Sequence, residues 1–396
     1  MIKLDNLRIA FPFVLLLAYG IFHCAYFFLP DYSDHYRLFG RMVFPLALFT
    51  VASSVRHLRH STLFQLVLAY MLYLLLTCFW ADVMDWYRLG QKLTISIYLV
   101  TLITSTCFLV RWNRRFFDLM LCVFLLVAAL AAVGNILFFY SENAFPTTRL
   151  EIYGSLTNQN EFSNIYGVFG IMAMGRALVA QSPAVKLTAA AIAVLTILFI
   201  WLNQSRTAFV ALLLAMSVLT ITSGKGKQLM RWSLGALVGI GVGLAFLLPE
   251  VVEEAMDRGT SLRPQIWLEI FRDALETPIL GHGLTQKVAV QFENIRLFET
   301  AHNAYLQVFW QGGVIGLGIF LLLLYVASRQ AWETGQREGD MTIFCILLFT
   351  MTVMLTGVDT LIERPRDQWI LFWLPVVLLL ANFSGAGSSR PEANGS

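Results

Sequence analysis

Two stretches of the chain place reactive side chains at the ends of long apolar runs. In ETAHNAYLQVFWQGGVIGLGIF, His302 comes just before an apolar run, and in WLNQSRTAFVALLLA, Arg206 separates two apolar runs. Histidine suits proton transfer near neutral pH because its unperturbed pKa is about 6.5. The planar guanidinium group of arginine matches phosphate oxygens in a bidentate geometry. Together these residue types point to a site that binds an anion and removes a proton.

Each of these residues also has an ordinary structural interpretation. A single histidine at the end of a span is more often a hydrogen-bonded structural group than a catalyst. If its helix begins near Thr300, His302 shares a helical face with Tyr305 and Phe309, and neighbouring arginines would keep the ring neutral, as a general base requires. For Arg206 the sequence leaves two interpretations open: a side chain that extends to the membrane surface, or one turned inward to hold an anion.

A third candidate lies in the one long connection between apolar runs, residues 249–302. The stretch RPQIWLEIFRDALETP within it has the apolar spacing of an amphipathic helix, with Pro264 at the first helical position. Arg263 then lies at the helix start, where free N–H groups favour anions, although an arginine there is more often simply solvated. Arg258 lies earlier in the same connection, after acidic residues with which it could pair.

The composition indicates that membrane helices must position these residues. Of the 396 residues, 58% are apolar and 13% are charged, and the mean hydropathy is +0.68, whereas about 25% of the residues in a soluble domain are charged. We therefore predict an all-α polytopic membrane protein with one long periplasmic loop that contains an amphipathic helix. Twelve spans are predicted, near residues 9–30, 38–55, 62–80, 91–110, 116–139, 160–180, 185–203, 207–222, 232–248, 303–327, 341–358 and 368–383.

The basic residues of alternate loops indicate how the spans are oriented. VRHLRH, RWNRR, GKGKQLMR and SRQAWETGQR all fall in loops on one side. Short basic loops stay in the cytoplasm, so both termini are predicted to be cytoplasmic. His302 and Arg206 then face the other side, which in a bacterium is the periplasm. The small and polar residues 385–396 are predicted to be disordered.

Motifs for several other functions are absent from the sequence. It contains no D-x-D, H-E-x-x-H, G-x-S-x-G or Walker motif, and its five cysteines lack the spacing of metal ligands. Charges inside the predicted spans are few, which argues against an ion-coupled transporter. We expect no metal, no cofactor and no nucleic-acid partner.

Four stretches resemble those of the O-antigen ligase family, which shares a module with O-antigen polymerases and bacterial O-linked oligosaccharyltransferases. They are GSLTNQNEFSNIYG (154–167), SRTAFVALLLA (205–215), the run from Arg263 to Trp267 that leads into TPILGHGL, and AHNAYLQVFWQGGVIGLG (301–318). The likeness divides the chain into N-terminal transmembrane helices (1–150), a ligase-like core (151–330) that includes the loop 249–302, C-terminal transmembrane helices (331–384) and the tail (385–396).

The resemblance implies a C-type glycosyltransferase in the inner membrane of a Gram-negative bacterium. Such an enzyme moves a glycan from undecaprenyl pyrophosphate to a sugar hydroxyl of lipid A–core, with inversion and without a metal, among the membrane lipids that carry both substrates. His302 would act as general base, and Arg206 and Arg263 would hold the pyrophosphate and stabilise charge on the leaving group. The further substrate contacts implied are Arg258, Asn160 and Asn303.

Three alternatives stay open at this point. An O-antigen polymerase uses the same donor with a second lipid-linked glycan as acceptor, and many polymerases have two large periplasmic loops, whereas one is predicted here. A protein O-oligosaccharyltransferase usually carries extra soluble regions that this sequence lacks. A lipid-linked glycan transporter would require polar or broken helices at mid-membrane depth, and the sequence shows few.

Overall fold

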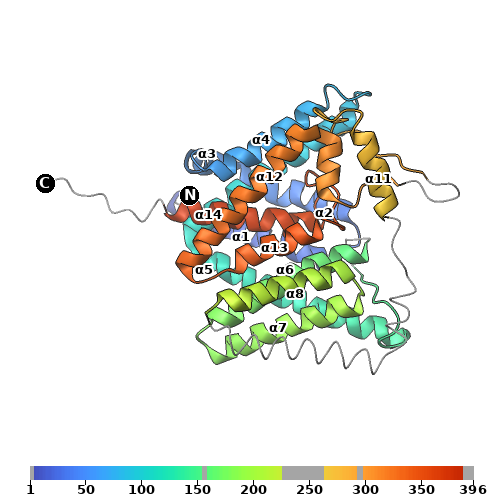
Figure 1. Ribbon diagram of the computed structural model, residues 1–396. Helices are drawn as coiled ribbons and strands as arrows, with labels where there is room; N and C mark the ends of the chain where they lie inside the picture. Colours follow the sequence, from blue (N-terminus) through green and yellow to red (C-terminus); the bar gives the residue numbers. More distant parts are fainter. Residues whose placement is uncertain (1–3, 154–157, 225–262, 292–297, 387–396) are drawn as a thin grey trace.

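The computed structural model describes residues 4–153, 158–224, 263–291 and 298–386, which form a bundle of helices (Figure 1). Its elements are α1 (Leu4–Cys24), η1 (Ala25–Phe27), α2 (Tyr32–Leu38), η2 (Phe39–Val43), α3 (Phe44–Leu58), α4 (Thr62–Thr77), α5 (Trp86–Glu142), α6 (Gln159–Val179), α7 (Pro183–Leu202), α8 (Arg206–Thr222), α11 (Arg263–Ala274), α12 (Ala304–Glu338), α13 (Thr342–Val353), η3 (Trp369–Trp373) and α14 (Leu374–Ala386). These described residues contain no strand beyond one isolated bridge, between Val290 and Phe298. The predicted span 232–248 and Arg258 lie outside the described residues.

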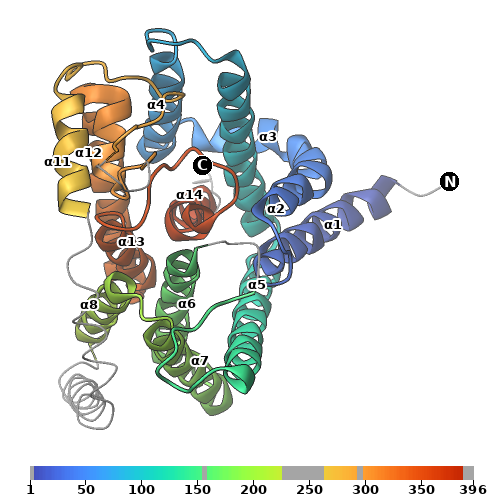
Figure 2. The ribbon, with the colours of Figure 1, turned by 90° about the vertical axis from the view of Figure 1, so that its right-hand side faces the viewer.

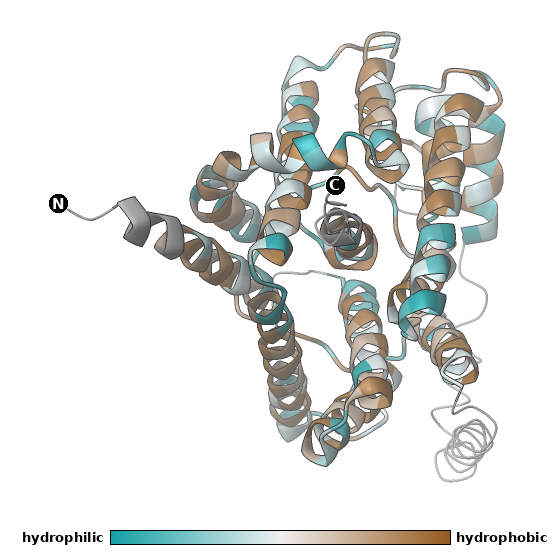
Figure 3. Ribbon diagram, turned by 90° about the vertical axis from the view of Figure 1, so that its left-hand side faces the viewer, coloured by the Kyte–Doolittle hydropathy of each residue, from teal (hydrophilic) through white to brown (hydrophobic). Residues whose placement is uncertain are grey.

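The helices have the length and apolar surface of a polytopic membrane protein. Six helical segments of the described chain are long and apolar enough to cross a membrane, and four shorter apolar helices accompany them. Apolar residues predominate along the helices (Figure 3). Every predicted span that falls within the described residues coincides with a helical segment, so the prediction of an all-α membrane protein is confirmed at this level.

Three predicted spans have different limits in the structure. The span predicted at 38–55 belongs to a longer helical segment, Tyr32–Leu58, because the side chain of Asp31 accepts a hydrogen bond from the Ser33 amide and caps α2. The spans predicted at 91–110 and 116–139 are joined in α5. The helix is interrupted at Asn113 (φ −160°, ψ 99°), within the predicted connection RWNRR.

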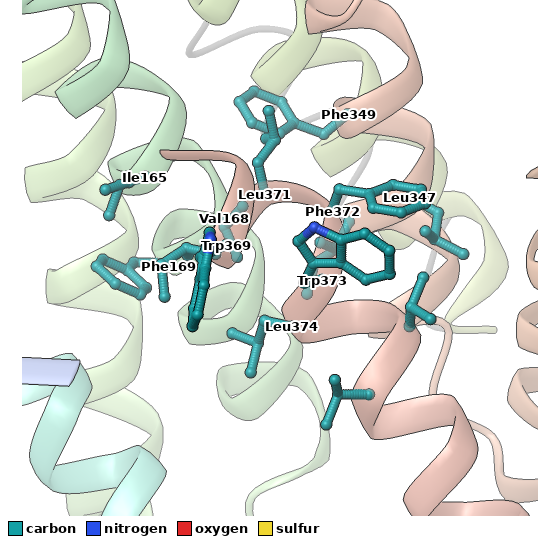
Figure 4. Packing of buried hydrophobic residues seen from close by; sticks show 14 of the residues in the cluster. Ile165, Val168, Phe169, Leu347, Phe349, Trp369, Leu371, Phe372, Trp373 and Leu374 are labelled. Carbon is teal, nitrogen blue, oxygen red and sulfur yellow. The ribbon is translucent and has the colours of Figure 1, made fainter. Parts of the chain in front are cut away.

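The core of the bundle is built around α14. Figures 2 and 3 show this helix near the centre, with the other helices around it. Figure 4 shows Trp369, Leu371, Phe372, Trp373 and Leu374 packed among Ile165, Val168 and Phe169 of α6 and Leu347 and Phe349 of α13. The indole N–H groups of Trp369 and Trp373 donate to the carbonyl oxygens of Glu363 and Leu361. The core therefore anchors the connection between α13 and α14, residues 354–368, which is called the α13–α14 connection below.

The helix α12 is interrupted at Gly313, and the loop that follows α11 forms hydrogen bonds with the backbone at this interruption. Gly313 has φ 61° and ψ −164°, which interrupts the helix. The freed backbone groups pair with the loop: the Val314 amide donates to the Pro278 carbonyl, and the Trp310 carbonyl accepts from the His282 amide. The adjacent small residues Gly312 and Gly316 lie against Tyr73 and Leu74 of α4, so α12 and α4 pack closely at this point.

We expect Gly313→Ala to destabilise the protein by about 2–4 kcal/mol, because positive φ is strained for alanine and the chain is closely packed there. A Cβ atom at this position would lie 2.2 Å from the carbonyl oxygen of Ile279. Thermal unfolding in detergent checks this. Gly318→Ala in the same helix is the control, since a Cβ atom there meets nothing within 4 Å. Equal midpoints for the two variants would contradict the role assigned to the break.

Candidate functional site

A cavity of about 460 Å³ is formed by residues of α6, α8, α11, the end of α13 and the connection before α6. Figure 2 views the molecule from the end at which α11 lies. The lining residues are Arg149, Asn160, Asn164, Gln204, Ser205, Arg206, Thr207, Arg263, Pro264, Trp267, Val353, Thr356 and Gly357. The cavity thus brings together three of the predicted site residues, Asn160, Arg206 and Arg263.

The starts of three helices meet at this cavity. Arg206 is the first residue of α8, Arg263 is the first residue of α11, and Asn160 lies in the first turn of α6. A helix start presents backbone N–H groups and the positive end of the helix dipole, both of which favour an anion. Arg149 adds a third guanidinium group, and none of the described lining residues is acidic. The arrangement favours a ligand with several negative charges, such as a diphosphate.

The charges of Arg206 and Arg263 influence each other. Burial lowers the pKa of the Arg263 guanidinium group, the Asp359 carboxylate opposes this shift, and the nearby Arg206 adds to it. The start of α8 is fixed to the segment after α13 by the Thr356 hydroxyl, which donates to the Thr207 hydroxyl over 2.8 Å. The two guanidinium groups are therefore held close enough to repel, and a bound anion would relieve that repulsion.

His302 lies beside the cavity and does not line it. Its Nδ1 atom is 3.3 Å from Oδ1 of Asp359, at ion-pair distance without the alignment of a hydrogen bond. The Trp267 indole, which lines the cavity, donates to the carbonyl oxygen of Ala301 over 2.8 Å. His302 is thus connected to the cavity through Trp267 on one side. On the other side His302 is linked to the cavity through Asp359, because the charge of Asp359 also acts on Arg263, which lines the cavity.

The local structure of His302 differs from the prediction in two respects. The helix begins at Ala304 and not near Thr300, because the side chain of Asn303 caps it by accepting from the Leu306 amide. His302 therefore precedes the helix with φ 48° and shares no helical face with Tyr305. Its charged neighbour is the Asp359 carboxylate, whereas the sequence predicts only arginines around it.

The other predicted substrate contacts have different surroundings. Asn160 lines the cavity, and its Oδ1 atom accepts from Arg149 over 3.1 Å. Asn303 is not among the residues that line the cavity, and its Oδ1 atom is used as the helix cap. Arg258 lies outside the described residues.

Two charged residues of the site, Arg149 and Asp359, were not predicted from the sequence. Arg149 precedes α6 in a connection without a recognisable motif. Asp359 belongs to TGVDTLIERPRDQW, a run of charged residues between two apolar spans. That run was a usable signal, because charges so close to two spans require partners.

Charged residues of the α13–α14 connection form ion pairs and hydrogen bonds with residues of α5 and α6. The Arg366 guanidinium group forms an ion pair with Glu161 of α6, and the Asn164 side chain donates to Oδ2 of Asp367 over 2.7 Å. Lys92 of α5 forms an ion pair with Glu363 over 2.8 Å. Buried charges next to the cavity are thus balanced by residues of α5, α6 and this connection.

These contacts shift the pKa values of the carboxyl groups in opposite directions. Burial by itself would raise the pKa of Glu363, but Lys92 holds it below its ordinary value. Burial and the neighbouring Glu161 raise the pKa of Asp367 to about 8. Asp367 is therefore largely protonated at neutral pH, while Glu363 is ionised.

In the part of the chain that the structure describes, no group of three or more His, Cys, Asp or Glu side chains is arranged to hold a metal ion. The positive charge around the cavity comes instead from guanidinium groups and helix starts.

The sequence is similar to one family model and to known transferases. Residues 191–321 match the family model described as O-antigen ligase. The chain is 28% identical to an O-antigen ligase of Pseudomonas aeruginosa over 380 residues, which cover 95% of this chain and 92% of that protein. It is also 26% identical to a ComP-specific O-oligosaccharyltransferase of Acinetobacter baylyi over 201 residues, which cover 46% of this chain and 35% of that protein.

The fold and these matches define a membrane enzyme of the glycosyltransferase type. More specifically, residues 191–321 are similar to the O-antigen ligase family, in agreement with the resemblance seen in the motifs. The matched region contains Arg206, Arg263 and His302, whereas Arg149 and Asp359 lie outside it.

We expect Arg366→Gln to destabilise the protein by about 3 kcal/mol, because it leaves the Glu161 carboxylate buried without its ionic partner. The double variant Glu161→Gln with Arg366→Gln should recover most of this loss. Chemical unfolding in detergent measures both. Arg329→Gln is the matched control, since the Arg329 and Glu333 side chains are 64% and 61% exposed, and its effect should stay within about 0.5 kcal/mol. No recovery in the double variant would contradict the pairing.

The raised pKa of Asp367 predicts how stability depends on pH. The folded protein keeps this proton up to about pH 8, whereas the unfolded chain loses it near the ordinary value of 3.8. The contribution of Asp367 to stability is therefore largest at low pH and falls through this window, by up to about 1.4 kcal/mol per pH unit.

Asp367→Asn should remove this contribution, which thermal unfolding from pH 5 to pH 9 can measure. Exposed Asp82→Asn serves as the control. Identical pH dependence in wild type and Asp367→Asn would show that Asp367 ionises normally in the folded protein.

Proposed function

We propose that this enzyme transfers a glycan from undecaprenyl pyrophosphate to a sugar hydroxyl of lipid A–core. The observation that carries the proposal is the cavity lined by three arginines, with no acidic residue among its described lining residues and with His302 beside it. The name of the Pseudomonas aeruginosa relative supports the reaction class, because the alignment extends over nearly the whole of both chains.

In the proposed mechanism, Arg206 and Arg263 bind the pyrophosphate of the donor. Their bidentate hydrogen bonds and the starts of α8 and α11 stabilise the charge that develops on the leaving group. These fixed positive charges do the work that a metal ion does in other phosphate-dependent enzymes, so we propose a metal-independent reaction. Asn160 is a further contact from the same cavity. Arg258 and Asn303 are retained as proposed contacts for the glycan or acceptor.

His302 acts as the general base in this proposal. Because Nδ1 faces Asp359, the atom assigned to proton transfer is Nε2, and Asp359 orients the ring and stabilises it once protonated. The acceptor hydroxyl gives its proton to Nε2 as its oxygen bonds to the anomeric carbon. The bond between that carbon and the pyrophosphate oxygen breaks at the same time. Attack from the side opposite the leaving group inverts the anomeric centre.

We further propose that the chain spans the inner membrane twelve times, with both termini in the cytoplasm and the cavity on the periplasmic side. The ends of α1 and α14 nearest the termini lie at the end of the bundle opposite α11 (Figure 1), which fits this orientation. The ligase-like core is proposed to extend over 151–330, beyond the matched residues 191–321, because Asn160 of α6 belongs to the cavity.

The test is a reaction of the purified protein with an undecaprenyl-pyrophosphate glycan in the presence of EDTA. We expect transfer to lipid A–core, and a loss of about 100-fold or more in His302→Ala with donor binding retained. His57→Ala, at an exposed position, is the matched control.

Parallel reactions replace the acceptor with additional donor or with an acceptor protein. Growth on donor alone would identify a polymerase, and transfer to protein would identify an oligosaccharyltransferase. Near-normal transfer by His302→Ala would exclude the general-base role. Unchanged activity in both Arg206→Lys and Arg263→Lys would exclude bidentate binding of the pyrophosphate.

A further inference from the structure

The segment before α6 is held against the turn between α7 and α8 by a short ladder of hydrogen bonds. The Leu150 amide donates to the Leu202 carbonyl over 3.0 Å. The Asn203 side chain donates to the Leu150 carbonyl over 3.0 Å, and the Gln204 side chain donates to the Thr147 carbonyl over 3.2 Å. Leu150 is fully buried, so the segment is also fixed by its apolar side chain.

Asn203 makes two further contacts, one with α6 and one with Arg149 of this segment. It is fully buried, and its Oδ1 atom interacts with the Ser163 hydroxyl of α6 over 2.7 Å. Its backbone carbonyl accepts from Nε of Arg149 over 2.9 Å. A single asparagine between α7 and α8, three residues before Arg206, therefore fixes α6, the preceding segment and the base of the Arg149 guanidinium group.

The Arg149 guanidinium group is oriented from two directions. Nε donates to Asn203, and an Nη atom donates to Oδ1 of Asn160 at the start of α6. Both acceptors are neutral oxygens, and the two contacts together set the plane of the group. A guanidinium group has five N–H donors, and this one lines the same cavity as Arg206 and Arg263.

We propose that Arg149 is a third phosphate-binding residue, which contacts the diphosphate of the prenyl-linked donor, and that Asn203 is its positioning residue. The proposal rests on the proposed function for the identity of the donor. The physical basis of phosphate binding by Arg149 does not depend on the transfer reaction. Two guanidinium groups at helix starts already favour an anion. A third guanidinium group that is already oriented adds charge-assisted hydrogen bonds at little cost in side-chain ordering.

The first experiment measures binding in the absence of transfer. Geranyl pyrophosphate serves as the probe, and its dissociation constant for the purified protein is determined by calorimetry in detergent. Arg149→Ala should raise this constant about 10- to 100-fold, the range expected for lost hydrogen bonds to a charged group. Arg149→Lys should raise it less, because the charge remains but the bidentate geometry is lost. Arg176→Ala, at an exposed position near the other end of α6, should leave it unchanged.

A double-variant cycle tests the positioning role. Asn203→Ala should weaken binding of the probe in the wild-type background and have little further effect in Arg149→Ala. If Asn203→Ala does not fold, Ser163→Ala removes one of its contacts more gently and serves in the same cycle. Additive effects would show that Asn203 acts on binding independently of Arg149.

Steady-state kinetics then distinguish the two possible sources of phosphate. If Arg149 binds the donor, Arg149→Ala raises KM for the donor and leaves KM for lipid A–core unchanged. An increase confined to KM for lipid A–core would overturn the assignment in favour of an acceptor phosphate. Equal probe affinity in Arg149→Ala and Arg176→Ala would overturn the proposal altogether. Absence of any transfer would refute the proposed function, but the binding result would still decide the role of Arg149.

Discussion

Repulsion between like charges is the constraint on which the site depends. Arg149, Arg206 and Arg263 line one cavity, and guanidinium groups in such a place separate unless the surrounding chain holds them. Two of them are the first residues of α8 and α11, and the third is oriented by Asn203 and Asn160. The helices that form the membrane bundle are therefore also the means by which positive charge is kept in one place. An anion with several negative charges is the ligand that such an arrangement stabilises best.

The α13–α14 connection supplies charged residues that interact with the charged groups at and beside the cavity. Asp359 faces both His302 and Arg263, and Arg366 pairs with Glu161. The same connection is anchored in the core by the indole groups of Trp369 and Trp373 (Figure 4). Packing at the centre of the bundle and electrostatics at its edge are thus coupled through about fifteen residues of chain. A change in the core can consequently affect the site without touching it.

The parts of the structure that depend on local sequence could be predicted, and those that depend on long-range contacts could not. Apolar runs predicted each described span. The spacing of Ile266, Trp267, Ile270, Phe271 and Ala274 predicted an amphipathic helix, and in α11 Ile266, Ile270 and Ala274 are buried whereas Phe271 is exposed. Arg206 and Arg263 were found because they stand at helix starts. Arg149 and Asp359 were missed because their roles come from partners 11 or more residues away, such as Asn160, Asn203 and His302. The position of His302 ahead of its helix depended on which residue caps it, and the capping role of Asn303 was not predicted.

The most direct test of the central claim is an electron cryomicroscopy map of the protein in lipid nanodiscs with saturating undecaprenyl pyrophosphate. We expect density for the two phosphates within the cavity, in contact with the guanidinium groups of Arg206 and Arg263 and close to the His302 ring. Diphosphate density elsewhere on the protein, with the arginine-lined cavity empty at the same ligand concentration, would contradict it.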